Sequence, residues 1–523
     1  MKRIYITTFL CSTLLLSSCN PDLLDTAPDN KYTESNFWKT EAAANAALTG
    51  IYAMLTEDGL YGGDATPLWE EGASPNAFCY SAGTQGFDAV GRGQQSASTG
   101  GIISARWKQA YQGIGRANTF LERISEVGLG QELQNRMEGE AYFLRAFYYF
   151  TLATYYGGVP IVLSAPDPES QKDLPRNSRE EVIQQVLTDI DLAVEKLPVK
   201  YTGADVGRAT KGAALALKAR VLLYEASPLL NTDNNIEKWQ TASVAAKAVI
   251  DLASEAGYDL FDNYRNLFLP ENENNREVIF DVQFLFPDAG SSFDLINSQY
   301  NSNAPLQSLA NAYEMKNGLQ ISDPNAGYNP ERPYDNRDPR LYATIVFPGD
   351  TFKGKPVTAS TFAQTGYAMK KYSIYDKETP PSDKADLKAN QSETNFIILR
   401  YADILLMYAE ALNESNPGHN DILTYINEVR SRVDMPNIPS GLGQEVMREI
   451  IRKERRIELA GEALYYNDVR RWKTAESAMN APIENWKNQV LETRKFDAKR
   501  DYWWPIPQAE LDLNPNLEQN PNY

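Results

Sequence analysis

The chain has 523 residues, of which 42% are hydrophobic and 23% are charged, the composition of a globular protein with ample material for a core. The formal net charge is -18, because 51 Lys and Arg face 69 Asp and Glu. A nucleic-acid binder, or a protein that binds membranes through a polybasic surface, would show the opposite balance. The composition therefore argues against both classes.

The N-terminus has the pattern of an export signal. Lys2 and Arg3 precede an apolar run from Ile4 to Leu16, which is too short to span a bilayer as a helix. The run ends in Leu16-Ser17-Ser18-Cys19, a string that resembles the bacterial lipobox, in which the signal is cleaved before the Cys and the thiol is lipidated. We therefore expect residues 1–18 to be a lipoprotein signal peptide, Cys19 to be lipidated and residues 19–40 to form a tether. The alternative is an ordinary signal peptide with an incidental Cys.

The residue after the lipobox and the cysteine count extend this prediction. Asn20, rather than Asp, resembles a signal for sorting to the outer membrane. Cys11 leaves with the signal and Cys19 takes the lipid, so Cys79 is alone and the mature chain cannot form an internal disulfide. The one histidine, His419, lies in a polar turn, and we expect Cys79 to be a small buried residue rather than a nucleophile.

The most strongly patterned stretch runs from Glu138 to Pro160. Its apolar and aromatic residues recur every three or four positions, the spacing that puts them on one face of an α-helix. Further aromatic residues, among them Phe143 and Phe147, fill the other faces, so the stretch predicts a helix that is buried on most sides. Gly157 and Gly158 favour its end, and Pro160 cannot continue it.

Similar patterns predict a mostly helical chain. The other expected helices are Glu41–Leu55 after a Thr40 cap, Trp107–Ile124, Ser178–Leu197 with a Ser178 and Glu181 capping box, Lys211–Ala226, Trp239–Leu252, Phe396–Glu414, Asp421–Val433 and Gln444–Gly461. Three of these helices carry alanines seven positions apart, which would let another helix approach closely, and this resembles the tetratricopeptide (TPR) repeat. The pairs are Ala146 with Ala153, Ala219 with Ala226, and Ala402 with Ala409. Since no strict period exists, chance spacing in alanine-rich helices is the alternative.

The chain divides by composition. Residues 41–261 and 396–523 read as helical parts that pack as one body, whereas 262–395 is rich in Asn, Asp, Gly, Pro and aromatic residues, with a strand-like run from Val278 to Phe286. We expect a mainly α fold, a TPR-like helical-repeat scaffold with long irregular loops and a small mixed insertion. The insertion would lie on the ligand side.

Several short motifs occur in order along nearly the whole mature chain. They are Leu24-Asp25 with Pro28, Phe37-Trp38, Glu140-Ala141-Tyr142-Phe143-Leu144-Arg145-Ala146, Tyr156-Gly157-Gly158-Val159-Pro160, Arg337-Asp338-Pro339-Arg340, Leu399-Arg400-Tyr401-Ala402-Asp403, Glu454-Arg455-Arg456-Ile457-Glu458-Leu459, Asp468-Val469-Arg470-Arg471-Trp472 and Trp504-Pro505-Ile506-Pro507. Each motif is weak alone, but their joint presence resembles the SusD/RagB family, the surface glycan-binding lipoproteins of Bacteroidota nutrient-uptake systems.

The resemblance implies a function. The TPR-like scaffold would pack as a lid on a SusC-like TonB-dependent transporter of the outer membrane, and the loop-rich side would present a glycan. It implies a lipid-anchored protein that faces the cell exterior and has no catalytic residues and no cofactor. Most motif residues belong to the scaffold, so we expect Arg145, Arg400, Asp403, Arg455 and Glu458 to form structural ion pairs or caps.

A glycan is bound by stacking an aromatic ring on the weakly apolar face of a sugar and placing polar side chains at its edge. The aromatic residues must therefore be exposed on loops beside polar groups. Two stretches qualify, Gly59–Gly101 and Phe284–Tyr334. The candidate ligand residues are Trp69, Tyr80, Phe87, Arg92, Tyr300 and Asn301. For each aromatic residue the alternative is loop packing against the scaffold.

The sequence contains few patterns that would indicate a metal site or an enzyme active site. Asp323, Asn325, Asn329 and Glu331 present oxygen donors that a structural calcium ion could use, but they lack the EF-hand pattern and a solvated turn is the alternative. A glycosidase needs two carboxylates flanking a cleft, and no spacing singles out a pair. The HExxH, GxSxG, P-loop and GxGxxG motifs are absent. A peptide-binding protein and a purely structural lid stay open beside the glycan binder, with a surface glycosidase as a weaker alternative.

Overall fold

The computed structural model describes residues 37–523. The predicted signal peptide, Cys19 and most of the predicted tether lie outside these residues. The fold is mainly α-helical, and side-chain caps fix several helix starts where the sequence predicts them. Thr40 accepts a hydrogen bond from the Ala43 amide, and Ser178 with Glu181 forms the expected capping box.

The long helices form the body of the molecule. They are α3 (Glu41–Tyr52), α6 (Ile102–Arg123), α7 (Gln131–Tyr156), α9 (Arg179–Lys196), α10 (Lys211–Ala226), α11 (Ile236–Ala256), α15 (Tyr401–Ser415), α16 (Asn420–Ser431) and α17 (Gln444–Glu458). Shorter α-helices are α4 (Thr66–Gly72), α5 (Phe87–Arg92), α8 (Pro168–Gln171), α12 (Phe293–Leu295), α13 (Gln307–Ala312), α14 (Pro339–Thr344), α18 (Tyr465–Arg471), α19 (Ala475–Met479) and α20 (Gln508–Leu513). Single turns of 3-10 or π helix are η2 (Ala53–Thr56), η3 (Ile124–Val127), η4 (Gly203–Asp205), η5 (Asn266–Phe268), η6 (Pro270–Asn272) and η7 (Ile296–Tyr300).

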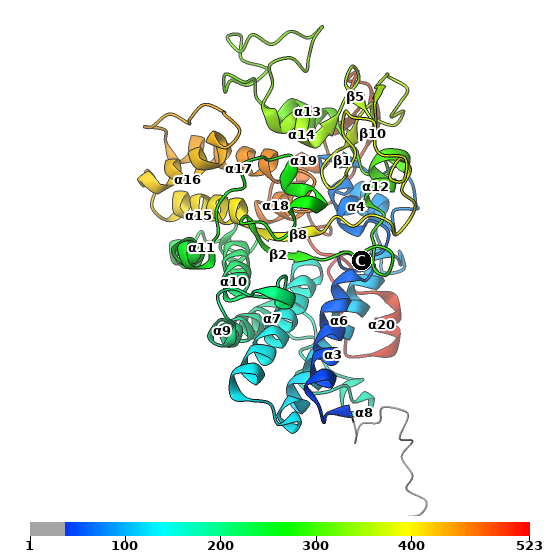
Figure 1. The fold of residues 1–523 in the computed structure, drawn as a ribbon, viewed down its shortest axis with the longest axis vertical. Helices are drawn as coiled ribbons and strands as arrows, with labels where there is room; N and C mark the ends of the chain where they lie inside the picture. The colour runs from blue at the N-terminus through cyan, green and yellow to red at the C-terminus, as the bar shows by residue number, and fades with distance from the viewer. Residues whose placement is uncertain (1–36) are drawn as a thin grey trace, which may run out of the picture.

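The long helices stack in chain order, as a TPR-like scaffold does. Helix α7 packs against α6 and α9, α10 packs against α9 and α11, and α15 packs against α11, α16 and α17 (Figure 1). The alanines predicted to admit a neighbouring helix are all buried, including Ala146, Ala219 and Ala402. Their small side chains therefore lie where helices meet, which confirms the predicted fold class.

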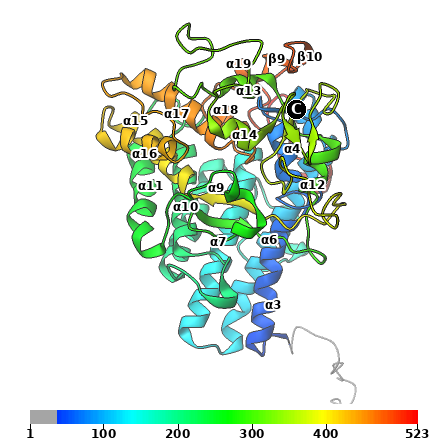
Figure 2. The same ribbon diagram turned by 45° about the horizontal axis from the view of Figure 1, so that its top comes forward.

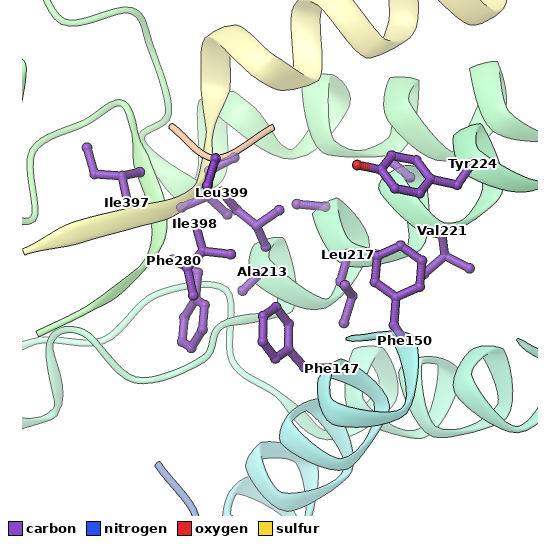
Figure 3. Close-up of a cluster of buried hydrophobic side chains, with 14 of the residues drawn as sticks. Phe147, Phe150, Ala213, Leu217, Val221, Tyr224, Phe280, Ile397, Ile398 and Leu399 are labelled. Carbon is purple, nitrogen blue, oxygen red and sulfur yellow. The ribbon is translucent and has the colours of Figure 1, made fainter. Parts of the chain in front are cut away.

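The centre of the molecule is a hydrophobic core between α7, α10 and a two-stranded ribbon. Figure 3 shows Phe147 and Phe150 of α7 directed toward the side chains of α10, with Ile398 from the ribbon nearby. Phe143 of α7 meets Phe280 edge to face, with ring centroids 4.9 Å apart. The aromatic residues of the Glu138–Pro160 stretch are thus core residues, which explains why they occupy every face of the helix.

The strands form antiparallel pairs in the described part of the chain. The pairs are β1 (Ala77–Phe78) with β3 (Ala304–Pro305), β2 (Val278–Val282) with β8 (Phe396–Arg400), β4 (Ile345–Val346) with β7 (Ala368–Met369), β5 (Thr351–Phe352) with β6 (Lys355–Pro356), and β9 (Pro482–Glu484) with β10 (Val490–Thr493). Because β2 pairs with β8, residues 283–395 leave and re-enter the helical body at one place. The division of the chain at residues 262 and 395 stays a prediction.

Two boundaries differ from the sequence-based expectation. The sequence predicts that a helix begins at Phe396, but Phe396–Arg400 form β8, because a short run of bulky apolar residues suits a buried strand as well as a helix. The strand expected at Val278–Phe286 ends at Val282. No helix in residues 37–523 combines the length and apolar character needed to cross a membrane.

Candidate functional site

Strand β10 and helix α13 lie at the end of the molecule opposite α3 (Figures 1 and 2). Five aromatic side chains come from this loop-rich part of the chain, and hydrogen bonds and ring contacts connect their segments. Tyr300 is 58% exposed, and the other four are half-buried. We call this set the aromatic loop surface; it consists of Tyr80, Tyr300, Tyr334, Phe347 and Trp486. The hydrogen bonds and packing described below connect its members.

The first part of the surface is fixed by a strand pair. Strand β1 pairs with β3, which brings the segment after Phe78 beside the segment before Ala304. Tyr80 consequently donates a hydrogen bond from its hydroxyl to the backbone carbonyl of Tyr300, at 2.6 Å. Phe78 and Ile483 pack beneath Tyr80 in a small apolar cluster, which connects β9 to the same place.

The second part is organised around Tyr367, which is buried. The Asn301 amide donates to the backbone carbonyl of Tyr367 at 2.8 Å, and the Tyr367 hydroxyl donates to Gln307 Oε1 at 2.5 Å. The hydroxyls of Tyr367 and Tyr334 lie 3.0 Å apart. Tyr334 in turn stacks on Phe347, with ring centroids 4.1 Å apart and an interplanar angle of 26°. This network links the loop that carries Tyr300 to the rings of Tyr334 and Phe347.

The third part is Trp486, on the turn between β9 and β10. Its backbone N–H donates to the Thr365 carbonyl at 2.9 Å. Its ring lies against Gly366, whose φ of 85° is in the left-handed region, and a Cβ atom at Gly366 would come within 2.1 Å of the Trp486 ring. Gly366 therefore makes room for the tryptophan, and the position next to Tyr367 ties Trp486 to the rest of the aromatic loop surface.

The prediction that Trp69 and Phe87 are exposed ligand residues is wrong, because both side chains are buried. Trp69 on α4 is 2% exposed, and its indole N–H donates to Ser302 Oγ at 2.8 Å. Phe87 on α5 is 0% exposed and contacts Trp504 edge to face. Neither ring can stack on a sugar. Trp69 instead supports the loop that carries Tyr300 from below, through its bond to Ser302.

Two polar candidates also serve the framework. Arg92 forms ion pairs with Asp88 at 2.9 Å and with Glu492 of β10 at 3.0 Å, so its guanidinium positions the β9–β10 hairpin. Asn301 is 4% exposed and uses its amide to hold Tyr367. Of the six residues selected from the sequence, Tyr80 and Tyr300 lie on the aromatic loop surface, and their ligand role stays a prediction.

Sequence reasoning missed Trp486, Tyr334 and Phe347. Trp486 stands alone among polar residues in the stretch Asn485–Gln489, which is the signal that could have found it. An aromatic residue in such a stretch has few neighbours in sequence against which to be buried. Tyr334 and Phe347 carry no comparable signal, because only the fold stacks them.

The stretch considered for calcium forms local turns. Asp323 Oδ1 accepts from the Asn325 amide at 2.8 Å, and Asn329 Oδ1 accepts from the Glu331 amide at 2.9 Å. These are bonds of short solvated turns, the alternative that the sequence left open. Across residues 37–523, no cluster of three or more His, Cys, Asp or Glu side chains is arranged to hold a metal ion.

The motif residues expected to be structural form buried ion pairs. Arg145 pairs with Asp189 at 2.7 Å, and Arg455 pairs with Asp403 at 2.7 Å. Arg400 reaches Glu458 at 2.8 Å. The prediction that Arg145, Arg400, Asp403, Arg455 and Glu458 are structural is confirmed.

The prediction that Cys79 is a buried residue is also confirmed. Burial raises the pKa of the Cys79 thiol to about 12. A thiol in this environment is a poor nucleophile.

Within the aromatic loop surface, the ring of Tyr300 is the one that is more than half exposed, at 58%, and it offers apolar contact. The polar groups beside the other rings are already bonded. Gln307 is buried, and its amide bonds to Asn311 and to the Tyr367 hydroxyl. Since the Tyr367 hydroxyl donates to Gln307, the Tyr334 hydroxyl donates to Tyr367. Burial raises the pKa of Tyr334.

Comparison with known families shows two matches. Residues 273–523 match the profile of the SusD family, and residues 22–223 match a SusD-like family described as starch-binding and associating with the outer membrane. Together the two matches cover most of the chain.

Relatives and solved structures agree with these matches. SusD-like protein P2 of Formosa agariphila is 28% identical over the whole of both chains. A SusD-like protein of Bacteroides fragilis has a TM-score of 0.80 at 28% identity, covering 95% of this chain and 100% of its own. A SusD-like carbohydrate binding protein of the same organism has a TM-score of 0.80 at 29% identity, covering 92% of this chain and 100% of its own.

Proposed function

The chain belongs to the SusD/RagB family, and from this premise we propose that it is a non-catalytic, surface glycan-binding lipoprotein. It captures an oligosaccharide or polysaccharide and delivers it to a SusC-like TonB-dependent transporter. A lipid on Cys19 anchors it in the outer membrane, facing the cell exterior. A relative of the same fold is named as a carbohydrate binding protein, which supports the ligand class.

The observation that carries the proposal is the aromatic loop surface. Its exposed and half-buried rings come from loops far apart in sequence, and a hydrogen-bond network holds them together. Aromatic rings cost free energy when they face water, and the 58% exposed Tyr300 beside four half-buried rings supports a binding surface. Strand β10 and helix α13 lie at the end opposite α3 (Figure 1), so a tether before α3 would leave the loops there accessible.

One cluster of buried carboxylates is unsuited to glycoside hydrolysis. Glu277, Glu458 and Glu462 all pair with Arg400, and each is buried. Carboxylates neutralised by arginine in the core cannot reach a glycosidic bond or exchange protons with it. They hold the fold together instead.

A binding experiment tests the proposal. Purified mature protein is titrated against a panel of polysaccharides by isothermal calorimetry, and each reaction is assayed for new reducing ends. We expect saturable binding of at least one glycan without release of reducing ends. Trp486→Ala and Tyr300→Ala should weaken that binding. The matched control is Trp503→Ala, a half-buried tryptophan that packs near Arg179 on the scaffold.

Other outcomes separate the remaining functions. If no polysaccharide binds but a peptide library does, the protein is a peptide carrier. If neither binds, the purely structural lid is favoured. Reducing ends that accumulate with time and disappear on inactivation would establish a glycosidase and overturn the proposal.

A further inference from the structure

An apolar groove that shares no residue with the aromatic loop surface lies where α3, α6, α8 and α20 meet. Figure 1 shows α20 beside α6. The groove has a volume of about 1180 Å³, and its walls include Trp107 and Tyr111 of α6 and Leu513 of α20. We call it the α6–α20 groove. Pockets for small ligands reach roughly 1,000 Å³, so this groove has room for a segment of polypeptide.

The walls of the groove offer apolar contact. Two of their polar side chains are bonded within the protein, since the Tyr111 hydroxyl donates to the Pro160 carbonyl and the Asn514 amide donates to the Leu174 carbonyl, both at 2.8 Å. Leu513, by contrast, is 76% exposed. An occupant with apolar side chains would remove this surface from water, which is favourable.

The charges of the groove are opposite to those of the chain as a whole. Among the described residues that line it, Lys108, Arg116 and Lys172 are cationic and Glu510 is the one carboxylate. All three cationic side chains are exposed. The whole chain carries a formal net charge of -18. Electrostatic complementarity therefore favours an occupant that is acidic as well as apolar.

Residues 20–36 of this chain have that composition. They lie outside the described residues, directly before Phe37. Their acidic residues outnumber the one basic residue, Lys31, and their largest apolar side chains are two adjacent leucines and a tyrosine. The acidic residues are Asp22, Asp25, Asp29 and Glu34, and the apolar residues are Leu23, Leu24 and Tyr32.

The segment joins the body at the groove and is long enough to cover it. Trp38 lines the groove and contacts Phe120 near the end of α6, with ring centroids 6.0 Å apart. The groove follows α6 from Trp107 to Thr119, which is about 18 Å of helix. The extended chain from Leu24 to Trp38 reaches about 45 Å, so the whole groove is within reach of the segment.

We propose that residues 20–36 dock in the α6–α20 groove of the same chain, with the leucine pair and Tyr32 against the apolar walls and the acidic side chains beside Lys108 and Lys172. The docking follows from the groove and the segment alone. Its consequence for the membrane rests on the proposed lipid on Cys19. Docking leaves only the residues next to the lipid free, so the body is held close to the bilayer.

A distance measurement by electron paramagnetic resonance tests the docking. Nitroxide labels are placed at Thr26→Cys and at Ala46→Cys in the mature chain, with Cys19→Ser. Ala46 is an exposed residue of α3 that does not line the groove, and Cys79 is buried and stays unlabelled. We expect one narrow distribution of distances. Lys108→Glu with Lys172→Glu should broaden it about twofold or more, toward that of a flexible linker.

A matched control separates the groove from net charge. Lys384→Glu with Lys388→Glu makes the same change in charge on two exposed lysines outside the groove, and it should leave the distribution narrow. The groove variant should bind glycan as the unchanged protein does, so failure of the docking is distinguishable from failure of the proposed function.

A second variant guards against misfolding of the first. Leu23→Ser with Leu24→Ser leaves every described residue unchanged, and it should broaden the distribution as the groove variant does. A broad distribution before any groove or leucine change, or a narrow one that both variants leave unchanged, would overturn the proposal. So would a dimer, seen by sedimentation, that dissociates on Lys108→Glu with Lys172→Glu, because the groove would then hold a second copy of the chain.

Discussion

The buried ion-pair network around Glu458 and the aromatic loop surface differ in burial and in the kind of contact that holds them. In the network, Glu458 is fully buried and pairs with Arg400, Arg432 and Arg340. On the surface, Tyr300 is 58% exposed and its ring has no such partner in the described structure. The network consists of residues from short recognisable motifs, and the surface consists of residues from loops without motifs. Features that identify the family therefore lie apart from those proposed to bind the ligand.

The network also explains how the loops are held. Glu458 and Glu454 of α17 reach Arg340 of α14, and Arg400 of β8 reaches Glu277 beside β2. The first two ion pairs tie the middle of the loop-rich segment to α17, and the third joins its two ends where β2 pairs with β8. A binding surface of half-buried rings needs such a rigid base, because ordering mobile loops when a ligand binds costs free energy and lowers the affinity.

The largest expected effect comes from breaking the network. Glu458→Gln removes one carboxylate and leaves three buried guanidinium groups short of a partner, so the free energy of unfolding should fall by about 3–5 kcal/mol. Urea denaturation followed by circular dichroism measures this loss. A decrease of less than about 1 kcal/mol would show that the network is not what stabilises the base of the loops.

Acid should weaken a second set of buried ion pairs, in which Asp403 pairs with Arg455 and Arg220, in a defined pH range. Burial opposes ionisation of Asp403, but Arg455 and Arg220 outweigh it and lower its pKa to about 2. The pKa is lower in the folded state than in the unfolded chain, so the stability that Asp403 contributes is present above pH 4 and is lost as the pH falls toward 2. This contribution is on the order of 2 kcal/mol.

The matched variant is Asp403→Asn, which cannot titrate. Its unfolding free energy is compared with that of the wild type at pH 7, 5 and 3. We expect the difference between the two proteins to shrink by roughly 1 kcal/mol between pH 5 and pH 3. A difference that stays constant over this range would contradict the assignment of the low pKa to Asp403.

Removing a ring from the surface should affect binding more than folding. Trp486→Ala should weaken glycan binding by about tenfold, which corresponds to about 1.4 kcal/mol. Its unfolding free energy should change less than that of Glu458→Gln, because the ring is only half-buried. Calorimetry and denaturation of the same preparation give both values. If Trp486→Ala loses stability but binds normally, the tryptophan belongs to the framework.

The smallest expected effect concerns the support of Tyr300. Tyr80→Phe removes the hydroxyl that donates to the Tyr300 carbonyl, and this hydroxyl lies near solvent. The stability change should be below about 1 kcal/mol, because water replaces much of the lost bond. Glycan affinity should fall about threefold, because Tyr300 loses part of its preorganisation. An affinity that rises on this change would show that the bond holds Tyr300 away from its binding position.

The sequence predicted the helices well because their signals are local. The periodicity of Glu138–Pro160 and the capping box at Ser178 both determine the structure of the residues that carry them. Strand β8 was misread, since its apolar run fits a buried strand or a helix and only its pairing with β2 decides.

The site was less predictable, as two tryptophans illustrate. Acidic residues follow Trp69 and polar residues surround Trp486, yet Trp69 is buried beneath the loops and Trp486 lies at the turn of a hairpin. The difference is set by contacts with Ser302 and Gly366, which are distant in sequence from the tryptophans they touch. Spacing along the chain carries no information on such contacts.

The most direct test is a crystal structure of the protein with a bound oligosaccharide that calorimetry has identified. The account predicts sugar rings in van der Waals contact, at about 4 Å, with Trp486 and Tyr300. A sugar bound on the helical scaffold around α3 and α6, with the aromatic loop surface empty, would contradict the central claim.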